Sequence, residues 1–562
     1  MRTIYLQFRE IAGKFKRRPV VHWALSGKSE KKRHWRTLNY LSFLNRVDRL
    51  SEGLRQLGVK PGDRVALMCE NGPDWLASDL ALNRLGAVSV PIHTTSNKPL
   101  IEYILKDSGS GFLIASNTCI KKNFEAIKEA AEKLKVIVVS REEGWREELG
   151  KEFAYFDDLL KDEAQGEIAR EELASIIYTS GTTGEPKGVM LTNENLLSNI
   201  EAALEKIKIF SSDVFLSILP VSHVLERMAG NYVPVLTGAS IAYAPSIKEL
   251  AGSLAESKPT VIIGVPKIFE NSYEKIVSEI EKKNKFIKKF FYRSLKRDQP
   301  NWVKIIADKL MYSKIRKKFG GRLRFSISGG AAINERIIKF FGRIGIKIIE
   351  GYGLTETSPI IAMNTVNDIR VGTVGRPASG VEVKIAPDKE ILVKGKNVMK
   401  GYWNKKELTD EVLSAEGWFR TGDLGFLDRD NFLTIIGRKK EILVTSNGKN
   451  ISPEKVEAII NLSPIISQSL VIGHKKPYLA CLVVADKKQL CEKYGEGCDV
   501  KAVMEKEIDH INHQLMSHER IRKIEMIEKP FTIEEEELTP TLKVRRSIIE
   551  HKYHRLIERI YS

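Results

Sequence analysis

"LASIIYTSGTTGEPKGVMLTNENLLSNIEAALEKI", residues 173–207, is the stretch that decides the fold. Its first six residues, 173–178, are mostly apolar and rich in isoleucine, which predicts a buried strand. From 193 to 207 the apolar residues recur at helical spacing, and Thr192 or Asn193 can serve as the N-cap. A strand, a loop and a helix in this order are typical of an α/β sheet.

The segment between strand and helix has the composition of a phosphate-binding loop. Glycines let backbone N–H groups approach an anion closely, while hydroxyl groups and a lysine add further donors. The stretch does not match the Walker A pattern G-x-x-x-x-G-K-[ST], and an ordinary flexible surface loop is the alternative. We expect phosphate contacts from Thr179, Ser180, Gly181, Thr182, Thr183, Gly184 and Lys187.

Strands and helices alternate elsewhere in the chain as well. Residues 63–69 and 87–93 predict strands on either side of a helix over 73–86, and 322–328 and 346–349 predict two more strands. Ligands of open parallel sheets bind at the carboxyl ends of the strands. The loops 179–188, 329–332 and 350–357 each follow a strand, so we expect them to meet at one sheet edge.

Several polar residues near these loops suit a nucleotide. Glu356 is the candidate ligand for Mg²⁺, with the Thr179 hydroxyl beside it, because Mg²⁺ takes one or two carboxylates plus phosphate oxygens. Tyr352 either stacks on a purine or is a half-buried core residue. Asp423 either accepts the ribose hydroxyls or closes an Asx-turn. Arg438 can reach ribose or phosphate. Residues 426–444 are predicted to form a hairpin that turns at 428–431.

Composition excludes several classes of protein. With 562 residues, 42% apolar and 29% charged, the chain is that of a folded protein rather than a disordered one. Five scattered cysteines without a C-x-x-C pair favour a reducing compartment over a disulfide or zinc framework. No signal peptide or membrane-spanning run is visible. We expect a cytoplasmic protein, with peripheral attachment to the inner membrane face left open.

The net charge of +18 is concentrated in one window. Residues 282–324 hold sixteen Lys or Arg against two Asp, together with aromatic residues that include Phe286, Phe290, Phe291, Tyr292 and Trp302. A solvated, lysine-rich helix pair is the simplest interpretation, and contact with an anionic membrane is the next. No nucleic-acid-binding motif is present, so we expect no nucleic-acid partner.

Five motifs in order resemble the acyl-adenylate-forming (ANL) superfamily over essentially the whole chain: "YTSGTTGEPKG", "YGLTET", "TGD", "GRKKEI" and "LTPTLK". The resemblance implies an α/β fold in which a large N-terminal domain of stacked doubly wound sheets, 1–438, is joined by a hinge to a small α+β domain, 439–562. It also implies ATP, Mg²⁺ and CoA. A carboxylate attacks the α-phosphorus of ATP to give acyl-AMP and pyrophosphate, and the CoA thiol then displaces AMP.

The resemblance also assigns roles to residues. Lys543 matches the catalytic lysine, although Leu542 stands where many relatives have glycine, and His223 matches a histidine that lines the acyl site. Lys440 matches the hinge, and Gly448 and Lys449 lie in the loop expected beside CoA. The remaining nucleotide-binding positions are Gly330, Ala331, Glu350, Gly351, Tyr352, Gly353, Thr355, Asp423 and Arg438.

"SHVLERM", residues 222–228, resembles long-chain fatty acid–CoA ligases. A fatty acid and CoA are therefore the expected substrates. The alternatives are a fatty acyl-AMP ligase that loads an acyl carrier protein, or a synthetase for a medium-chain or aryl acid. Chain length, pathway and oligomeric state, monomer or homodimer, stay open.

Overall fold

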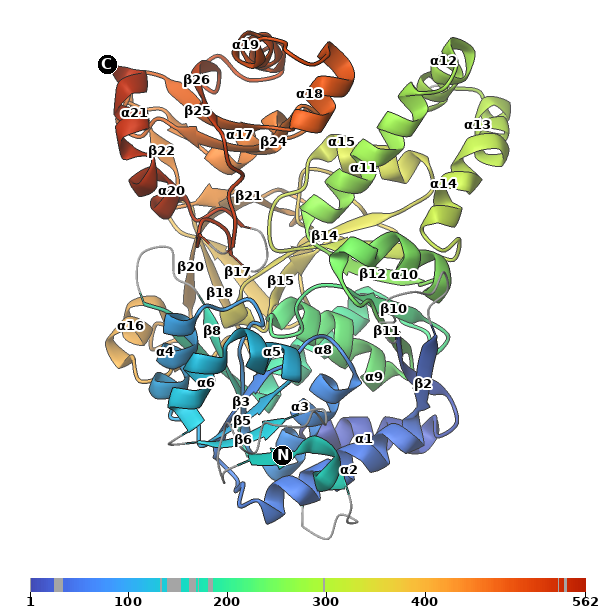
Figure 1. Ribbon diagram of the computed structural model, residues 1–562, viewed down its shortest axis with the longest axis vertical. Coiled ribbons are helices and arrows are strands. Elements are labelled where there is room, and N and C mark those ends of the chain that lie inside the picture. The colour runs from blue at the N-terminus through green and yellow to red at the C-terminus, as the bar shows by residue number, and fades with distance from the viewer. Residues whose placement is uncertain are drawn as a thin grey trace.

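The computed structural model describes residues 2–24, 34–131, 134–138, 153–160, 168–169, 171–179, 185–296, 299–533, 535–539 and 543–562. An eight-stranded sheet lies at one end of the molecule (Figure 1). Its inner strands are parallel, and the β8–β9–β19 edge is antiparallel. The strand order is β19 (Gly401–Tyr402), β9 (Lys187–Thr192), β8 (Leu173–Thr179), β4 (Val88–Pro91), β3 (Arg64–Met68), β5 (Phe112–Ala115), β6 (Lys135–Val138) and β7 (Phe153–Tyr155).

A nine-stranded sheet packs beside it, also with a parallel centre. The helix α3 (Pro73–Leu85) is buried on almost every side and contacts β3 and β4 of one sheet and β1 of the other. A helix that is buried all round lies inside a core, so α3 holds the two sheets together. The strand order is β16 (Arg376–Pro377), β15 (Ile360–Met363), β14 (Ile348–Gly353), β13 (Phe325–Ser328), β12 (Val261–Gly264), β10 (Val214–Ser217), β11 (Ser240–Tyr243), β1 (Pro19–Ala24) and β2 (Trp35–Asn39).

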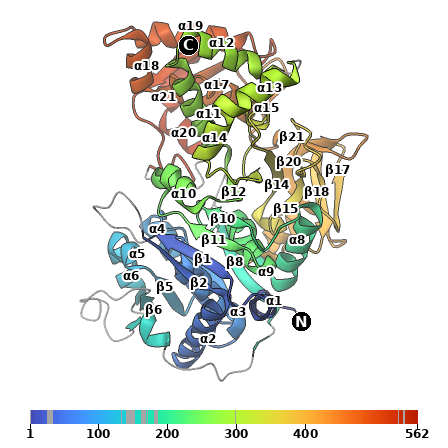
Figure 2. The same cartoon turned by 90° about the vertical axis from the view of Figure 1, so that its right-hand side faces the viewer.

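Helices cover both large sheets, as a doubly wound fold requires. Those of the large N-terminal part are α1 (Ile4–Lys14), α2 (Tyr40–Gln56), α4 (Lys98–Ser108), α5 (Asn117–Lys122), α6 (Phe124–Ala131), α8 (Asn193–Lys206), α9 (Val233–Thr237), α10 (Leu250–Ser257), α11 (Pro266–Glu281), α12 (Lys285–Ser294), α13 (Asn301–Ala307), α14 (Ser313–Lys318), α15 (Glu335–Arg343) and α16 (Lys406–Val412). Figures 1 and 2 show α11 to α14 as an arm beside the C-terminal unit.

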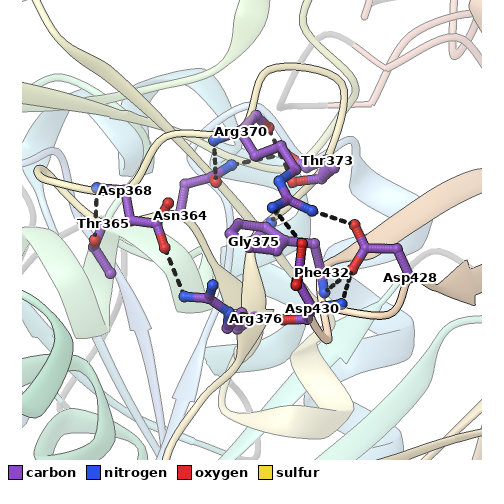
Figure 3. A network of polar contacts seen from close by, with 10 residues as sticks. All are labelled: Asn364, Thr365, Asp368, Arg370, Thr373, Gly375, Arg376, Asp428, Asp430 and Phe432. Carbon is purple, nitrogen blue, oxygen red and sulfur yellow. Dashed lines mark hydrogen bonds and ion pairs between the residues drawn. The ribbon is translucent and has the colours of Figure 1, made fainter.

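A third, antiparallel sheet carries two of the predicted site residues. It consists of β17 (Val381–Ile385), β18 (Glu390–Gly395), β20 (Phe419–Leu427) and β21 (Leu433–Arg438). Arg370, in the loop after β15, and Arg376, in β16, stack on Phe432 of its last hairpin, 3.9 Å and 4.1 Å from the ring centroid (Figure 3). Arg370 also pairs with Asp428 at 2.5 Å and Asp430 at 2.8 Å. These contacts fix the third sheet against the nine-stranded one.

The C-terminal unit has hydrophobic clusters of its own. Buried members of the two N-terminal clusters end at Leu433, and those of the C-terminal clusters begin at Leu443. Its strands are β22 (Leu443–Val444), β23 (Asn450–Ile451), β24 (Ile466–Ile472), β25 (Leu479–Ala485) and β26 (Ile521–Ile527). Its helices are α17 (Pro453–Ile460), α18 (Lys487–Tyr494), α19 (Val500–Asn512), α20 (Arg546–Lys552) and α21 (His554–Tyr561).

The predicted elements that frame the site are confirmed with small shifts at their ends. Thr192 is the N-cap of α8, where its hydroxyl accepts from the Asn195 N–H. The predicted hairpin forms between β20 and β21, and Asn431 takes a positive φ of 64° in its turn. Within the described part of the chain, none of the helices combines the length and the apolar character that crossing a membrane demands.

Candidate functional site

The glycine-rich stretch forms the tip of a β-hairpin, which corrects the predicted strand–loop–helix order. β8 and β9 pair antiparallel, with Thr179 opposite Lys187. β9 forms before the helix because Val189 and Leu191, which alternate along the chain, are fully buried. The phosphate contacts predicted for the tip fall outside the described residues: Ser180, Gly181, Thr182, Thr183 and Gly184.

The three predicted loops do not share one sheet edge, because β8 belongs to the eight-stranded sheet and β13 and β14 to the nine-stranded one. The loops at 185–188 and 350–357 are joined instead by residues 399–403, which run between the two sheets. The Trp403 N–H donates to the Gly188 carbonyl at 2.7 Å, and the Met399 N–H donates to the Glu356 carbonyl at 2.8 Å. The candidate site therefore lies where the two sheets meet.

At this junction Tyr402 connects the lysine of the hairpin to the predicted metal ligand. The Lys187 ammonium lies 5.0 Å from the centroid of the Tyr402 ring. The Tyr402 hydroxyl donates to Glu356 Oε1 at 2.9 Å. Glu356 sits half-buried in the short turn η5 (Thr355–Thr357), directly after the half-buried Thr355. Tyr402 thus contacts both a cation and a carboxylate.

The chemistry of Glu356 fits a magnesium ion that is shared with phosphate. No group of three or more His, Cys, Asp or Glu side chains is placed to hold a metal among the described residues. Mg²⁺ is commonly held by one or two carboxylates together with substrate phosphates rather than by a cage of protein ligands. One carboxylate, from Glu356, agrees with that pattern, and Thr179 stands opposite Lys187 in the hairpin.

Asp423 is the most firmly held polar residue of the site. The Tyr352 hydroxyl donates to Asp423 Oδ2 at 2.7 Å, and Arg438 Nε lies 3.2 Å from Oδ1. Asp423 and Arg438 face each other across β20 and β21, so the sheet register brings them together. Burial raises the pKa of Asp423, and the charges of Arg438 and Lys543 and the hydrogen bond from Tyr352 oppose that rise.

Lys543 comes to this wall from the C-terminal unit. Its backbone pairs with Thr539: the Lys543 N–H donates to Thr539 Oγ1 at 3.0 Å, and the Thr539 N–H donates to the Lys543 carbonyl at 2.8 Å. The positive charge of Lys543 lowers the pKa of both Asp423 and His223. One side chain therefore acts electrostatically on the nucleotide residues and on the predicted acyl residue together.

His223 is a neutral imidazole. Burial is the main cause that lowers its pKa to about 3, and the nearby His93 and Lys543 lower it further. Its Nδ1 accepts a hydrogen bond from the Leu225 N–H at 3.2 Å. A neutral imidazole that accepts at Nδ1 carries its proton on Nε2. His223 is thus a hydrogen-bond donor at neutral pH and not a cation.

The predicted loop "EGYG" is in fact the second half of a strand. β14 pairs parallel with β13 up to Glu350 and antiparallel with β15 from Gly351. Gly353 has no room for a side chain, because a Cβ there would lie 1.7 Å from the Pro359 carbonyl oxygen. Glu350 is buried, and burial raises its pKa to about 8. Its carboxyl is therefore mostly protonated at neutral pH.

The other predicted residues lie at varying distances from this cluster. The turn after β13 runs between the His223 loop and β14, since a Cβ at Gly329 would lie 3.1 Å from Leu225 Cδ2. Gly330 and Ala331 are exposed on that turn. Lys440 is exposed just after β21, and Gly448 and Lys449 form a tight turn with Thr445 in the C-terminal unit. Among the described residues, no hydrogen bond or ion pair links these last three to the large domain.

The two charged residues of "SHVLERM" point into the core. Arg227 is 2% exposed and pairs with Asp79 at 2.5 Å, and its guanidinium also donates to Ser175 and Tyr232. Glu226 is fully buried in the π-turn η2 (Glu226–Tyr232), where burial raises its pKa to about 8. These side chains fix the segment that presents His223.

Sequence reasoning missed three residues that complete the site. Tyr402 stands in "KGYW", where nothing in a single sequence separates it from a core tyrosine. His93 follows the short strand β4, and the Ser222 hydroxyl lies 2.6 Å from its Nδ1. Asn97, at the start of α4, donates to Glu536 of the C-terminal unit. Polar residues that directly follow a parallel strand are the signal that could have found His93.

Comparisons with known proteins identify the family. Residues 8–403 match the family model described as AMP-binding enzyme, and 440–562 match the AMP-binding enzyme C-terminal domain. A long-chain-fatty-acid–CoA ligase of Mycobacterium bovis is 33% identical over 563 residues, covering 94% of this chain and 93% of the relative. A peroxisomal long-chain acyl-CoA synthetase of Arabidopsis thaliana is 30% identical, covering 91% and 80%.

Solved structures share the fold at lower identity. The adenylation domain of a carboxylate reductase from Mycobacterium chelonae superimposes with a TM-score of 0.84 at 22% identity, covering 100% of this chain and 91% of that one. The o-succinylbenzoate–CoA synthetase of Bacillus subtilis in complex with AMP gives 0.71 at 22% identity, covering 97% and 98%. The stacked sheets with a separate C-terminal unit are therefore the adenylate-forming fold.

Proposed function

Because this chain belongs to the AMP-binding enzyme family, we propose that it activates a fatty acid to an acyl adenylate and transfers the acyl group to CoA. In the first step a carboxylate oxygen attacks the α-phosphorus of ATP, and the bond to pyrophosphate breaks. In the second, the CoA thiol attacks the acyl carbon, loses its proton and releases AMP. Relatives that are 27–33% identical are named as long-chain fatty acid–CoA ligases or long-chain acyl-CoA synthetases, which favours a long-chain acid.

The convergence of Lys543 on two sets of residues is the observation that carries this proposal. Its charge acts on Asp423 at the nucleotide side and on His223 at the acyl side. A cation whose charge acts on both can neutralise the negative charge that develops as carboxylate meets α-phosphate. The neutral His223 can donate its Nε2–H toward the acyl carboxylate without adding a second positive charge.

The wall residues then divide the nucleotide among them. Asp423 offers a carboxylate to the ribose hydroxyls, Tyr352 offers a ring face to the purine, and Arg438 balances the charge of Asp423. Lys187 and the residues of the hairpin tip would hold the β- and γ-phosphates. Glu356 and Thr179 would hold Mg²⁺, which supplies further neutralisation of the phosphate charge.

The second half-reaction requires a different face of the C-terminal unit. We propose that residues 439–562 rotate about Lys440, which is exposed between β21 and β22. Hinges are commonly element-terminal positions away from the chemistry. The rotation would withdraw Lys543 and bring Gly448 and Lys449 to the thiol of CoA.

The basic window 282–324 is proposed to contact an anionic membrane from the cytoplasmic side. Its helices α12 and α13 lie away from both large sheets (Figure 1), while α14 contacts α10. An enzyme for an amphiphilic acid gains by resting on the surface that holds its substrate. Lysines near an anionic surface each contribute about 1 kcal/mol of attraction.

ATP–pyrophosphate exchange over acids from acetate to the longest common fatty acids, with and without CoA, tests the catalytic proposal. We expect exchange without CoA for long-chain acids, and acyl-CoA with AMP once CoA is added. Exchange with acyl transfer to an acyl carrier protein but not to CoA would contradict the second step. Absence of exchange with every acid would contradict the first.

A further inference from the structure

The arm formed by α11 to α14 exposes apolar side chains on a face that covers nothing within the described chain. Trp302 is 60% exposed, Ile305 66% and Leu310 54%, while Val303 and Ala307 of the same helix are buried against the arm. Trp302, Ile306 and Leu310 recur every four residues and so form one stripe. Large contiguous apolar patches are rare on monomers and mark interaction surfaces.

A basic hollow of about 420 Å³ adjoins this stripe, between the end of α13 and α15. Lys304, Lys309 and Arg343 line it, and none of the three forms an ion pair with any described residue. The carboxylate in the hollow, Asp308, is occupied by Arg316, whose two Nη atoms lie 2.5 and 2.9 Å from its oxygens. The hollow thus holds uncompensated positive charge.

We propose that this hollow binds the phosphate of an anionic phospholipid headgroup while the adjoining apolar stripe enters the membrane interface. The inference rests on the proposed membrane contact of 282–324 and assigns it a specific site. Three cations around a hollow suit a phosphodiester. A lipid is favoured over free phosphate because Ile305 lines the hollow and is also part of the exposed apolar face, which a soluble anion would leave uncovered.

The arrangement of side chains agrees with the physics of the interface. Tryptophan prefers the depth of the headgroups, and lysine stems can lie along apolar surface while their ammonium groups remain in water. Basic residues on one side and Trp, Ile and Leu on the other characterise helices that lie in the plane of the interface. The headgroup site would orient the arm, because it fixes one point beside the stripe.

The test compares two variants that lose equal charge from the same arm. One is Lys304→Gln/Lys309→Gln/Arg343→Gln, which removes the three positive charges that line the hollow. The matched control, Lys283→Gln/Lys285→Gln/Lys289→Gln, changes exposed lysines outside it. Co-sedimentation with vesicles of phosphatidylcholine, with and without phosphatidylglycerol, measures binding. We expect the hollow variant to lose about tenfold more affinity for the anionic vesicles than the control; equal losses would overturn the site.

Further arms separate the lipid from other occupants. Trp302→Ser/Ile305→Ser should weaken vesicle binding that persists at about 0.5 M salt, where exposed charges are screened. If that variant instead changes the molecular mass by sedimentation equilibrium and not vesicle binding, the face joins two copies of the chain and the proposal fails. Saturable binding of inorganic phosphate, lost in the hollow variant while its vesicle binding equals the control's, would assign a soluble anion.

Measuring ATP–pyrophosphate exchange in the same variants separates the headgroup site from the proposed catalytic function. All variants should retain the wild-type rate of ATP–pyrophosphate exchange with an acid supplied in detergent, because none of the changed residues lies at the site. Loss of vesicle binding with exchange intact supports the headgroup site. Absence of exchange in the wild-type protein would contradict the catalytic proposal and leave the vesicle comparison interpretable.

Discussion

The two sides of the site are held in very different ways. Asp423 sits on one wall, where strands β20 and β21 fix it beside Arg438 and the Tyr352 hydroxyl fixes its second oxygen. Lys543 belongs to the C-terminal unit, where among the described residues its backbone forms hydrogen bonds only with Thr539. The side chains of the wall are held in place within the large domain, whereas Lys543 is carried by the C-terminal unit. Residues of the wall should therefore serve both half-reactions, and Lys543 only the first.

The contacts between the C-terminal unit and the large domain are mostly polar, with Leu462 packed against the N-terminal hydrophobic cluster. Arg336 donates to Gln514 at 3.0 Å, Lys282 lies 3.9 Å from Glu492, and Asn97 donates to Glu536. Exposed polar pairs of this kind contribute about 1 kcal/mol or less each. An interface of that character permits relative motion of the two units.

Lys543→Ala should produce the largest effect and the most asymmetric one. Removing a preorganised charge partner of the transition state costs about 10²- to 10³-fold in rate. We expect that loss in ATP–pyrophosphate exchange, with transfer of a supplied acyl adenylate to CoA unchanged. Lys529→Ala, an exposed lysine of the same unit, is the control. Equal losses in the two half-reactions would remove the distinction between wall and delivered lysine.

Asp423→Ala should affect both half-reactions, because the wall binds the nucleotide in each. The change leaves Arg438 without its carboxylate and takes the ribose acceptor away. We expect a loss of about tenfold or more in exchange and in thioester formation, with a raised KM for ATP. Glu382→Ala, which removes an exposed carboxylate on β17 of the same sheet, is the matched control. A loss confined to exchange would place Asp423 with Lys543.

The sequence predicted individual strands and helices better than it predicted how they pair in the folded chain. Periodicity located β3, α3, β8 and α8, because each has a long apolar pattern. It missed β9, since Lys187 and Gly188 resemble the loop residues before them more than the start of a strand. It also placed three loops at one sheet edge, although they belong to two different sheets that are joined by hydrogen bonds from residues 399–403. Long-range pairing of that kind leaves no local periodic signal.

Individual site residues show the same division. Asp423 and Arg438 could be named from their motifs, and the hairpin register explains why they belong together. Tyr402, which joins Lys187 to Glu356, carries no such motif. Asn97 and Glu536 are 439 residues apart in the chain, so only the folded arrangement of the two units reveals their contact.

Asn97→Asp tests whether the contact between Asn97 of the large domain and Glu536 of the C-terminal unit holds the loop of Lys543 in position. The Asn97 Oδ1 caps α4 by accepting from the Leu100 N–H at 3.2 Å, while its Nδ2 donates to Glu536. Aspartate keeps the cap but sets a second carboxylate against Glu536. We expect exchange to fall about three- to tenfold, because the loop of Lys543 is no longer held, with thioester formation unchanged.

A second substitution separates the latch from a general structural effect. Glu536→Gln in the Asn97→Asp background removes the repulsion and restores a donor, so exchange should recover toward the wild-type rate. A double-mutant cycle on the two half-reactions measures the coupling. Additive losses in the cycle, or a parallel fall in thioester formation, would show that the contact does not position Lys543.

Glu226→Gln probes the buried segment that presents His223 and should have the smallest effect, on stability rather than on rate. Burial raises the pKa of Glu226 to about 8, and Gly230 makes room for the carboxyl, since a Cβ there would lie 2.4 Å from Oε1. Between the ordinary glutamate pKa and about 8 the folded chain holds a proton that the unfolded chain has lost. The free energy of unfolding therefore falls as pH rises through that window.

Glutamine removes this titration while preserving the shape of the side chain. We expect the midpoint of urea unfolding to depend less on pH between about 5 and 8.5 in the variant than in the wild type, with the variant relatively more stable at the upper end. Glu205→Gln, on the exposed face of α8, is the control and should leave the slope unchanged. An unchanged slope in Glu226→Gln would mean that its carboxyl stays ionised in the core. The core around η2 would then contain a charge that compensates the Glu226 carboxylate, in addition to the Arg227–Asp79 pair.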